Sequence, residues 1–85
     1  MKTFDYTITD TLGIHARPAG ELVALAKTFA SRITIAGNGK SADCKRMLAV
    51  MSLGIKQGHT VSVTAEGGDE DNAAAALKDF LMRSL

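Results

Sequence analysis

The chain has 85 residues, of which 46% are hydrophobic, 22% charged and 5% aromatic. This length supplies one compact hydrophobic core and is too short for two, so we expect a single domain over residues 1–85. The formal net charge of +1, from 10 basic and 9 acidic residues, gives no strong field to attract nucleic acid, and few aromatic side chains are available to stack on bases. We therefore expect no nucleic-acid partner.

Cysteine usage and hydropathy indicate the compartment. Cys44 is the only cysteine and cannot form an intramolecular disulfide. No charged-then-apolar leader opens the sequence, and no apolar run approaches membrane-spanning length. His15, Cys44 and His59 lack the spacing of a metal site. These features predict a cytoplasmic protein with no membrane insertion, no metal and no cofactor.

The first half of the chain alternates between two kinds of apolar periodicity. Residues 1–9 place apolar side chains at every second position, which predicts a strand. Residues 16–29 place them three and four apart, which predicts an amphipathic helix. Period two returns on both sides of Gly37-Asn38-Gly39, whose residues accept positive φ, and this predicts a hairpin.

The second half predicts a short helix, a strand and a final helix. The short helix covers residues 47–53 and ends at Gly54, and residues 61–65 form the last strand. The final helix begins near Asp69, and the acidic residues of its first turn are expected to interact with its free N–H groups. Four strands with one apolar face and three helices with one apolar stripe each predict an α+β fold, an open-faced β-sandwich with the sheet covered on one side.

The short helix has apolar residues on more than one face. They are Met47, Leu48, Val50, Met51 and Leu53. A helix that is apolar all round is often a covered core helix, but flexible Met side chains and an exposed apolar cluster also suit a protein-docking patch. Both interpretations stay open, and Lys45 and Arg46 would add positive charge at the rim of such a patch.

The run Gly13-Ile14-His15-Ala16-Arg17-Pro18-Ala19 places a histidine directly before a helix. The first N–H groups of a helix have no intrahelical partner and attract anions, phosphate above all. Arg17 adds a fork of donors suited to phosphate oxygens, and Pro18 fits the first turn. A neutral imidazole can act as a nucleophile, so His15 is the candidate reactive residue, with Ala16 and Arg17 as candidate phosphate ligands.

Other chemistry finds little support in the sequence. Gly39-Lys40-Ser41 looks like the end of a P-loop, but the earlier glycine is missing and a strand follows, so this segment is a hairpin tip. Neither His15 nor Ser52 has a convincing partner for a hydrolytic triad, and a small hydrolase that uses His15 as its base would lack a pocket.

Several separate motifs, in order, resemble those of one known family. They are the Gly13–Ala19 run, Asn38-Gly39-Lys40, Val50-Met51-Ser52-Leu53-Gly54, Lys56-Gln57-Gly58, and Ala65-Glu66-Gly67 followed by Asp69-Glu70. The chain resembles, nearly end to end, the HPr family of histidine-containing phosphocarrier proteins of the bacterial phosphoenolpyruvate-dependent sugar phosphotransferase system. The resemblance implies a four-stranded antiparallel sheet in which the first strand lies beside the fourth, followed by the second and the third.

The resemblance also implies roles for individual residues. His15 would accept a phosphoryl group on Nδ1 from phosphorylated enzyme I and pass it to sugar-specific A components, with Arg17 stabilising the phosphate. A docking surface for these partners would include Met47, Leu48, Met51 and Gly54, with Lys45 and Arg46. Such a protein is a carrier, expected as a monomer, rather than a stand-alone enzyme. The alternative is a regulatory interaction module on the same scaffold, acting by docking without bulk sugar transport.

Two positions depart from the pattern of the family. Many members carry a regulatory serine, phosphorylated by a dedicated kinase, where this chain has Arg46. Arginine cannot accept that phosphate, so serine-linked regulation is not expected. Leu12 replaces a residue that is often small or polar, and we expect it to alter the stability of the phosphohistidine.

Overall fold

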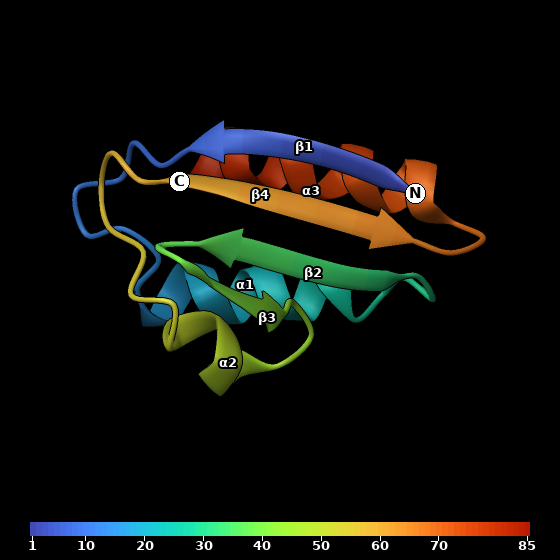
Figure 1. The fold of residues 1–85 in the computed structure, drawn as a ribbon, viewed down its shortest axis with the longest axis horizontal. Helices are drawn as coiled ribbons and strands as arrows, with labels where there is room; N and C mark the ends of the chain where they lie inside the picture. Colours follow the sequence, from blue (N-terminus) through green and yellow to red (C-terminus); the bar gives the residue numbers. More distant parts are fainter.

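Four antiparallel strands form one sheet, and the computed structural model, which describes all 85 residues, places the helices on one side of it (Figure 1). The elements are β1 (Lys2–Thr7), α1 (Ala16–Ala26), β2 (Arg32–Gly37), β3 (Lys40–Asp43), α2 (Met47–Met51), β4 (Thr60–Glu66) and α3 (Glu70–Ser84). The strand order is β1-β4-β2-β3, with every neighbouring pair antiparallel. The expected open-faced α+β fold and its strand order are therefore confirmed.

The core lies between the sheet and the two longer helices. Alternate strand residues point inward, as the period of two predicts, and β4 buries Val61, Val63 and Ala65. Leu22 of α1 and Leu77 of α3 are fully buried opposite the sheet. Both helices lie behind the sheet in Figure 1, whereas α2 packs at the β3 edge, against α1. None of the three helices combines the length and the apolar content that a membrane span requires.

Three predicted elements end earlier than the sequence indicated, and one of them is the short helix, which stops at Met51 instead of residue 53. The first strand stops at Thr7, and the first helix stops at Ala26, after which the Phe29 amide bonds the Ala26 carbonyl in a tighter turn at 3.2 Å. The hairpin tip is as expected, since Asn38 and Gly39 have φ of 54° and 77°, the pair of positive values that a two-residue turn needs.

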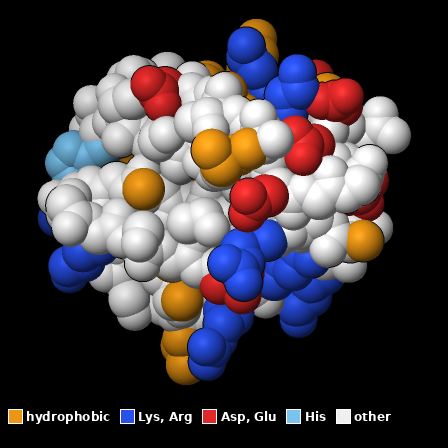
Figure 2. Space-filling view, turned by 45° about the vertical axis from the view of Figure 1, so that its right-hand side comes forward, with side chains coloured by type: hydrophobic (Ala, Val, Ile, Leu, Met, Phe, Trp, Pro, Cys, Tyr) orange, Lys and Arg blue, Asp and Glu red, His pale blue; other side chains and the backbone are white.

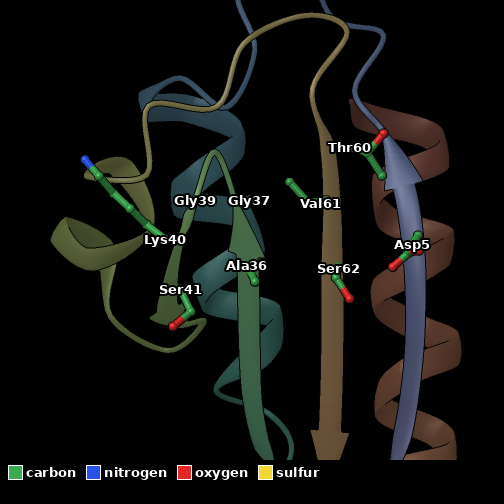
Figure 3. Close-up of a pocket in the computed structure, with 9 residues that line it drawn as sticks. All are labelled: Asp5, Ala36, Gly37, Gly39, Lys40, Ser41, Thr60, Val61 and Ser62. Atoms are coloured by element: carbon green, nitrogen blue, oxygen red, sulfur yellow. The ribbon is translucent and has the colours of Figure 1, made fainter.

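The outer face of the sheet is polar and open. Figure 2 shows mostly white surface, which is polar side chain and backbone, with small separated hydrophobic side chains. A shallow depression of about 490 Å³ lies on this face, bordered by Asp5, Lys40, Ser41, Thr60 and Ser62 among others (Figure 3). None of the predicted site residues lines it.

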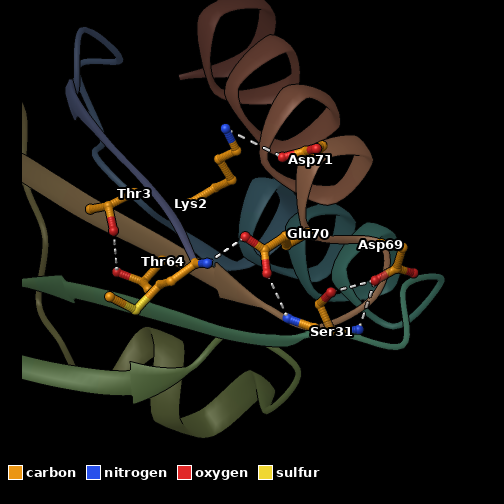
Figure 4. Close-up of polar contacts among 9 residues, drawn as sticks. Lys2, Thr3, Ser31, Thr64, Asp69, Glu70 and Asp71 are labelled. Atoms are coloured by element: carbon orange, nitrogen blue, oxygen red, sulfur yellow. Dashed lines mark hydrogen bonds and ion pairs between the residues drawn. The ribbon is translucent and has the colours of Figure 1, made fainter.

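The start of α3 differs from the expectation. The Asp69 side chain makes no capping hydrogen bond to its own helix; its carboxylate instead accepts the Ala30 amide at 2.8 Å, the Ser31 amide at 2.9 Å and the Ser31 hydroxyl (Figure 4). The Ser31 hydroxyl, followed by the Ala30 amide, holds the pKa of Asp69 below its ordinary value. The acidic group therefore fastens the α1–β2 connection to the start of α3.

Glu70 makes a second tie at the same place. Its carboxylate accepts the Gly67 amide at 3.2 Å and lies 2.5 Å from the amino group of Met1 (Figure 4). These contacts join the start of β1 to the loop before α3, and they lower the pKa of Glu70, the amino group of Met1 being the largest cause.

Candidate functional site

The loop between β1 and α1 is built on an Asp-led turn. The Gly13 amide donates to the Asp10 carbonyl at 3.0 Å, and the Leu12 amide donates to Oδ1 of Asp10 at 2.8 Å. This is an Asx turn, in which a short carboxylate side chain imitates a backbone acceptor. Because Oδ1 is held from within the loop, the carboxylate of Asp10 has a defined position.

Two other segments fix this loop at the end of the sheet. The Ile14 amide donates to the Ile55 carbonyl at 3.1 Å, so the loop lies against the α2–β4 connection, as Figure 1 shows. The Thr9 and Asp10 amides both donate to the carbonyl oxygen of Leu85, at 2.6 and 2.9 Å. The position of the loop therefore depends on contacts with distant parts of the sequence.

Gly13 is required where the loop meets that connection. Its φ is +68°, and a Cβ there would lie 2.7 Å from the Cα of Lys56 and closer still to the Ile55 carbonyl oxygen. Only glycine combines this conformation with this close approach. The backbone just before the histidine is thus held tightly.

His15 is the N-cap of α1. Its backbone is extended, with φ −96° and ψ −178°, and its carbonyl accepts the Ala19 amide at 3.0 Å. Its side chain makes no capping bond and is 36% exposed, and its Nε2 lies 3.7 Å from Oδ1 of Asp10. Histidine is a poor N-cap compared with Ser, Thr, Asp or Asn, so the helix gives up a stabilising cap at this position.

The amides that follow His15 have no protein acceptor. Neither the Ala16 nor the Arg17 N–H bonds to any group of the chain, and the next residue, buried Pro18, has no N–H to satisfy. The Arg17 side chain is exposed and forms no ion pair. Two free amides, a guanidinium and the positive end of the helix dipole can therefore converge on an anion carried by the imidazole.

The predicted docking residues of α2 separate into two faces. Val50 is buried in the core and Met47 is half-buried, packed over α1 beside Gly20. Leu48 is 81% exposed and Met51 39% exposed. One face of the helix is therefore part of the core, and the other is exposed and apolar, which the docking interpretation requires. Figure 2 shows hydrophobic side chains next to basic ones at the lower edge, where α2 lies in Figure 1.

The residues around α2 do not all face solvent. Arg46 is exposed at the N-cap, and Gly54 is exposed with φ +64° after the helix. Lys45 is half-buried, and its ammonium donates to the Phe29 carbonyl at 2.7 Å. The expected pair of rim charges is therefore reduced to one free charge, Arg46, because the Phe29 carbonyl holds the ammonium of Lys45.

The remaining candidate groups lie elsewhere or are unreactive. Burial raises the pKa of the Cys44 thiol to about 12, so it carries no thiolate near neutral pH. Nδ1 of His59 accepts the Lys56 amide at 3.0 Å and closes the turn before β4. No group of three or more His, Cys, Asp or Glu side chains has metal-binding geometry.

Asp10 is the site residue that sequence reasoning missed. Its signal was the spacing Asp10-x-x-Gly13 of a tight turn directly before the histidine, but that spacing predicts only the turn. The direction of the His15 ring, which brings Nε2 toward the carboxylate, appears only in the structure.

Comparisons with known proteins show the family to which the chain belongs. The family described as the PTS HPr component phosphorylation site matches residues 2–83. The phosphocarrier protein HPr of Lysinibacillus sphaericus is 49% identical over 81 residues, which cover 95% of this chain and 92% of the relative. The phosphocarrier protein HPr of Mycoplasma capricolum is 40% identical over 82 residues, covering 96% and 92%.

The fold gives the same result. The solved structure of a histidine-containing phosphocarrier protein of Mycoplasma matches with a TM-score of 0.95 at 38% identity, over 98% of this chain and 94% of that one. The sequence matches and the structural match both extend over almost the full length of this chain and of the matched proteins. The chain therefore belongs to the HPr family, the phosphocarrier proteins of the phosphotransferase system.

Proposed function

We propose that this phosphocarrier holds its phosphoryl group on Nδ1 of His15. The observation that carries the assignment is the pair of unpartnered amides of Ala16 and Arg17 directly after the ring. Because Nε2 is turned toward Asp10, the phosphoryl group is assigned to the other ring nitrogen, Nδ1, which by covalent structure is the one closer to the backbone. The exposed guanidinium of Arg17 adds charge stabilisation.

Transfer at this site needs positioning and charge more than covalent machinery. The lone pair of Nδ1 attacks phosphorus, and the new N–P bond forms as the bond to the donor breaks. The free amides and Arg17 neutralise charge on the phosphoryl oxygens. The site is shallow, so the partner protein supplies its other half, and the donor proposed here is phosphorylated enzyme I, with sugar-specific A components as acceptors.

The docking surface proposed for both partners is the exposed face of α2, formed by Leu48, Met51 and Arg46. It joins the His15 loop through the α2–β4 connection, whose Ile55 carbonyl accepts the Ile14 amide. A small apolar patch with one charge at its rim suits brief complexes, as a carrier needs. We propose that the chain works as a monomer in the cytoplasm.

Phosphate incorporation tests the assignment of His15. With phosphoenolpyruvate and enzyme I, the protein should gain one acid-labile, base-stable phosphate, and His15→Ala should gain none. His59→Ala is the matched control, because it removes the other imidazole, and it should be labelled like the parent. Labelling of His15→Ala would exclude the proposed site.

The docking role of Arg46 can be tested by association kinetics. Arg46→Ala should slow association with enzyme I by about three- to tenfold at low salt, because a charge at the rim acts mainly on the association rate. The difference should shrink as salt screens it. Lys78→Ala removes the same charge from the exposed side of α3 and serves as the control. An unchanged rate for Arg46→Ala would remove Arg46 from the docking surface.

A further inference from the structure

The carboxylate of Asp10 lies beside the ring nitrogen that the proposed reaction does not use. Its Oδ1 is 3.7 Å from Nε2 of His15 and is held there by the Leu12 amide at 2.8 Å. The backbone of Asp10 is also fixed, since its amide donates to Leu85 and its carbonyl accepts from Gly13. The loop thus presents a negative charge to one edge of the ring.

The surroundings of the ring favour a proton on Nε2. The ionised carboxylate of Asp10 can only accept a hydrogen bond, and its Oδ1 lies 3.7 Å from Nε2. A negative charge at this distance favours the tautomer that turns an N–H, rather than a lone pair, toward it. The unpartnered amides of Ala16 and Arg17, which follow His15 directly, can only donate and offer no acceptor to an N–H on Nδ1. Both features therefore favour the Nε2–H tautomer of the neutral ring.

We propose that Asp10 is a positioning residue that keeps the His15 proton on Nε2, and so keeps Nδ1 available as the nucleophile. The effect on the phosphorylated ring rests on the proposed function, whereas the effect on the tautomer of the free ring does not. Neither the family resemblance nor the sequence pattern assigned a role to Asp10.

The phosphorylated ring benefits from the same contact. When Nδ1 uses its lone pair to form the N–P bond, the proton on Nε2 stays in place and the ring gains one positive charge. The carboxylate of Asp10 stabilises that charge. In the onward step the N–P electrons return to Nδ1 as the acceptor bonds phosphorus, and the ring leaves as a neutral imidazole with its Nε2 proton. A protonated ring is thus the better leaving group.

The chain contains a matched control for the turn that holds Asp10. Asp43 leads a turn of the same design: its Oδ1 accepts the Lys45 amide at 2.9 Å, and its carbonyl accepts the Arg46 amide at 3.0 Å. Asp10→Asn and Asp43→Asn each remove one negative charge and keep an amide oxygen for the turn. Only the first change removes a charge beside His15.

The tautomer can be read directly by long-range ¹H–¹⁵N correlation spectra of the imidazole at alkaline pH. The parent and Asp43→Asn should show the Nε2–H form in excess. Asp10→Asn should raise the ratio of Nδ1–H to Nε2–H by about fivefold, the size expected of a single charge at this distance in a mostly aqueous setting. An unchanged ratio in Asp10→Asn overturns the proposal.

The lifetime of the phosphorylated protein is a second readout, because a change that only loosened the loop would not lengthen it. Asp10→Asn should lose phosphate about three- to tenfold more slowly at neutral pH than the parent, since the positively charged ring loses the carboxylate that stabilises it, and should transfer the phosphate onward more slowly. Faster loss in Asp10→Asn would contradict the proposal. If instead His15 takes no phosphate in any variant, the proposed function fails while the tautomer experiment still decides the role of Asp10.

Discussion

The starts of α1 and α2 contain the same kind of Asp-led turn. In each, the Asp side chain accepts one amide and its carbonyl accepts the next, at Asp10 before α1 and at Asp43 before α2. The turn ends two residues before the N-cap of α1, His15, and at the N-cap of α2, Arg46, and both N-caps have extended backbone and no side-chain cap. Under the proposed function, the turn alone therefore does not make a reactive site.

The two starts differ in the N-cap side chain and in what faces it, since amides without an acceptor follow both N-caps. At α1 an imidazole lies 3.7 Å from a carboxylate, and the helix behind it has 11 residues. At α2 the side chain is a cation at the positive end of a helix of only five residues. In the proposed function, the first arrangement holds a covalently bound anion, and the second offers a charge and an apolar face to another protein.

Moving the histidine is the most severe test of this comparison. The double variant His15→Ala/Arg46→His places an imidazole at the N-cap of α2, after the same kind of turn. We expect less than about 1% of the parent rate of phosphate incorporation, because stabilisation of the transferred charge has to be positioned in advance. The measurement is labelling with phosphoenolpyruvate and enzyme I, and incorporation at position 46 would show that the turn is sufficient.

Alanine at the two glycines beside these regions should have unequal effects on stability. Gly13 and Gly54 both have positive φ, +68° and +64°, but a Cβ at Gly13 would collide with backbone, whereas at Gly54 the nearest atom is 3.6 Å away, on Asn38. Gly13→Ala should lower the free energy of unfolding by about 3 kcal/mol or more, and Gly54→Ala by about 1 kcal/mol. Urea denaturation measures both values, and equal losses would mean that the His15 loop is not tightly held.

Elements with strong local signals could be predicted from the sequence alone. The strands, the helix after His15 and the hairpin tip at Asn38 and Gly39 each follow from the residues within them, because periodicity and positive φ are local properties. The strand order came from the family resemblance, since periodicity does not say which strands pair.

Side-chain contacts over long sequence separations could not be predicted. Lys45 was expected to face solvent, but its ammonium reaches a carbonyl 16 positions earlier, and Asp69 was expected to serve its own helix, but it binds amides 38 and 39 positions earlier. A polar side chain finds whichever unpaired backbone group the fold brings near, and no local pattern encodes that partner. Asp10 was missed for the same reason, because its contact with Nε2 depends on the orientation of the His15 ring.

The start of α3 is a third helix start to compare, and its acidic N-cap, Asp69, has a structural role. Asp69 has a lowered pKa in the folded protein, owing first to the Ser31 hydroxyl, so its stabilising contribution is complete above its ordinary pKa. That contribution is lost as pH falls through the lower, folded value. Asp69→Asn should therefore unfold at lower urea than the parent at neutral pH, and the two midpoints should converge in strong acid.

A control variant and a difference measurement separate the contribution of Asp69 from the other effects of acid on stability. Asp71→Asn removes an exposed carboxylate that pairs with Lys2 at 3.4 Å, and its midpoint should stay near that of the parent at every pH. Glu70 also has a lowered pKa, so it too loses a stabilising contribution in acid, and the informative quantity is the difference between Asp69→Asn and the parent at each pH. A difference that stays constant from neutral to acid pH would mean that the charge of Asp69 is not what stabilises this junction. Phosphate incorporation by Asp69→Asn should match that of the parent, because Asp69 lies beside Ala30 and Ser31, at the end of α1 opposite to His15.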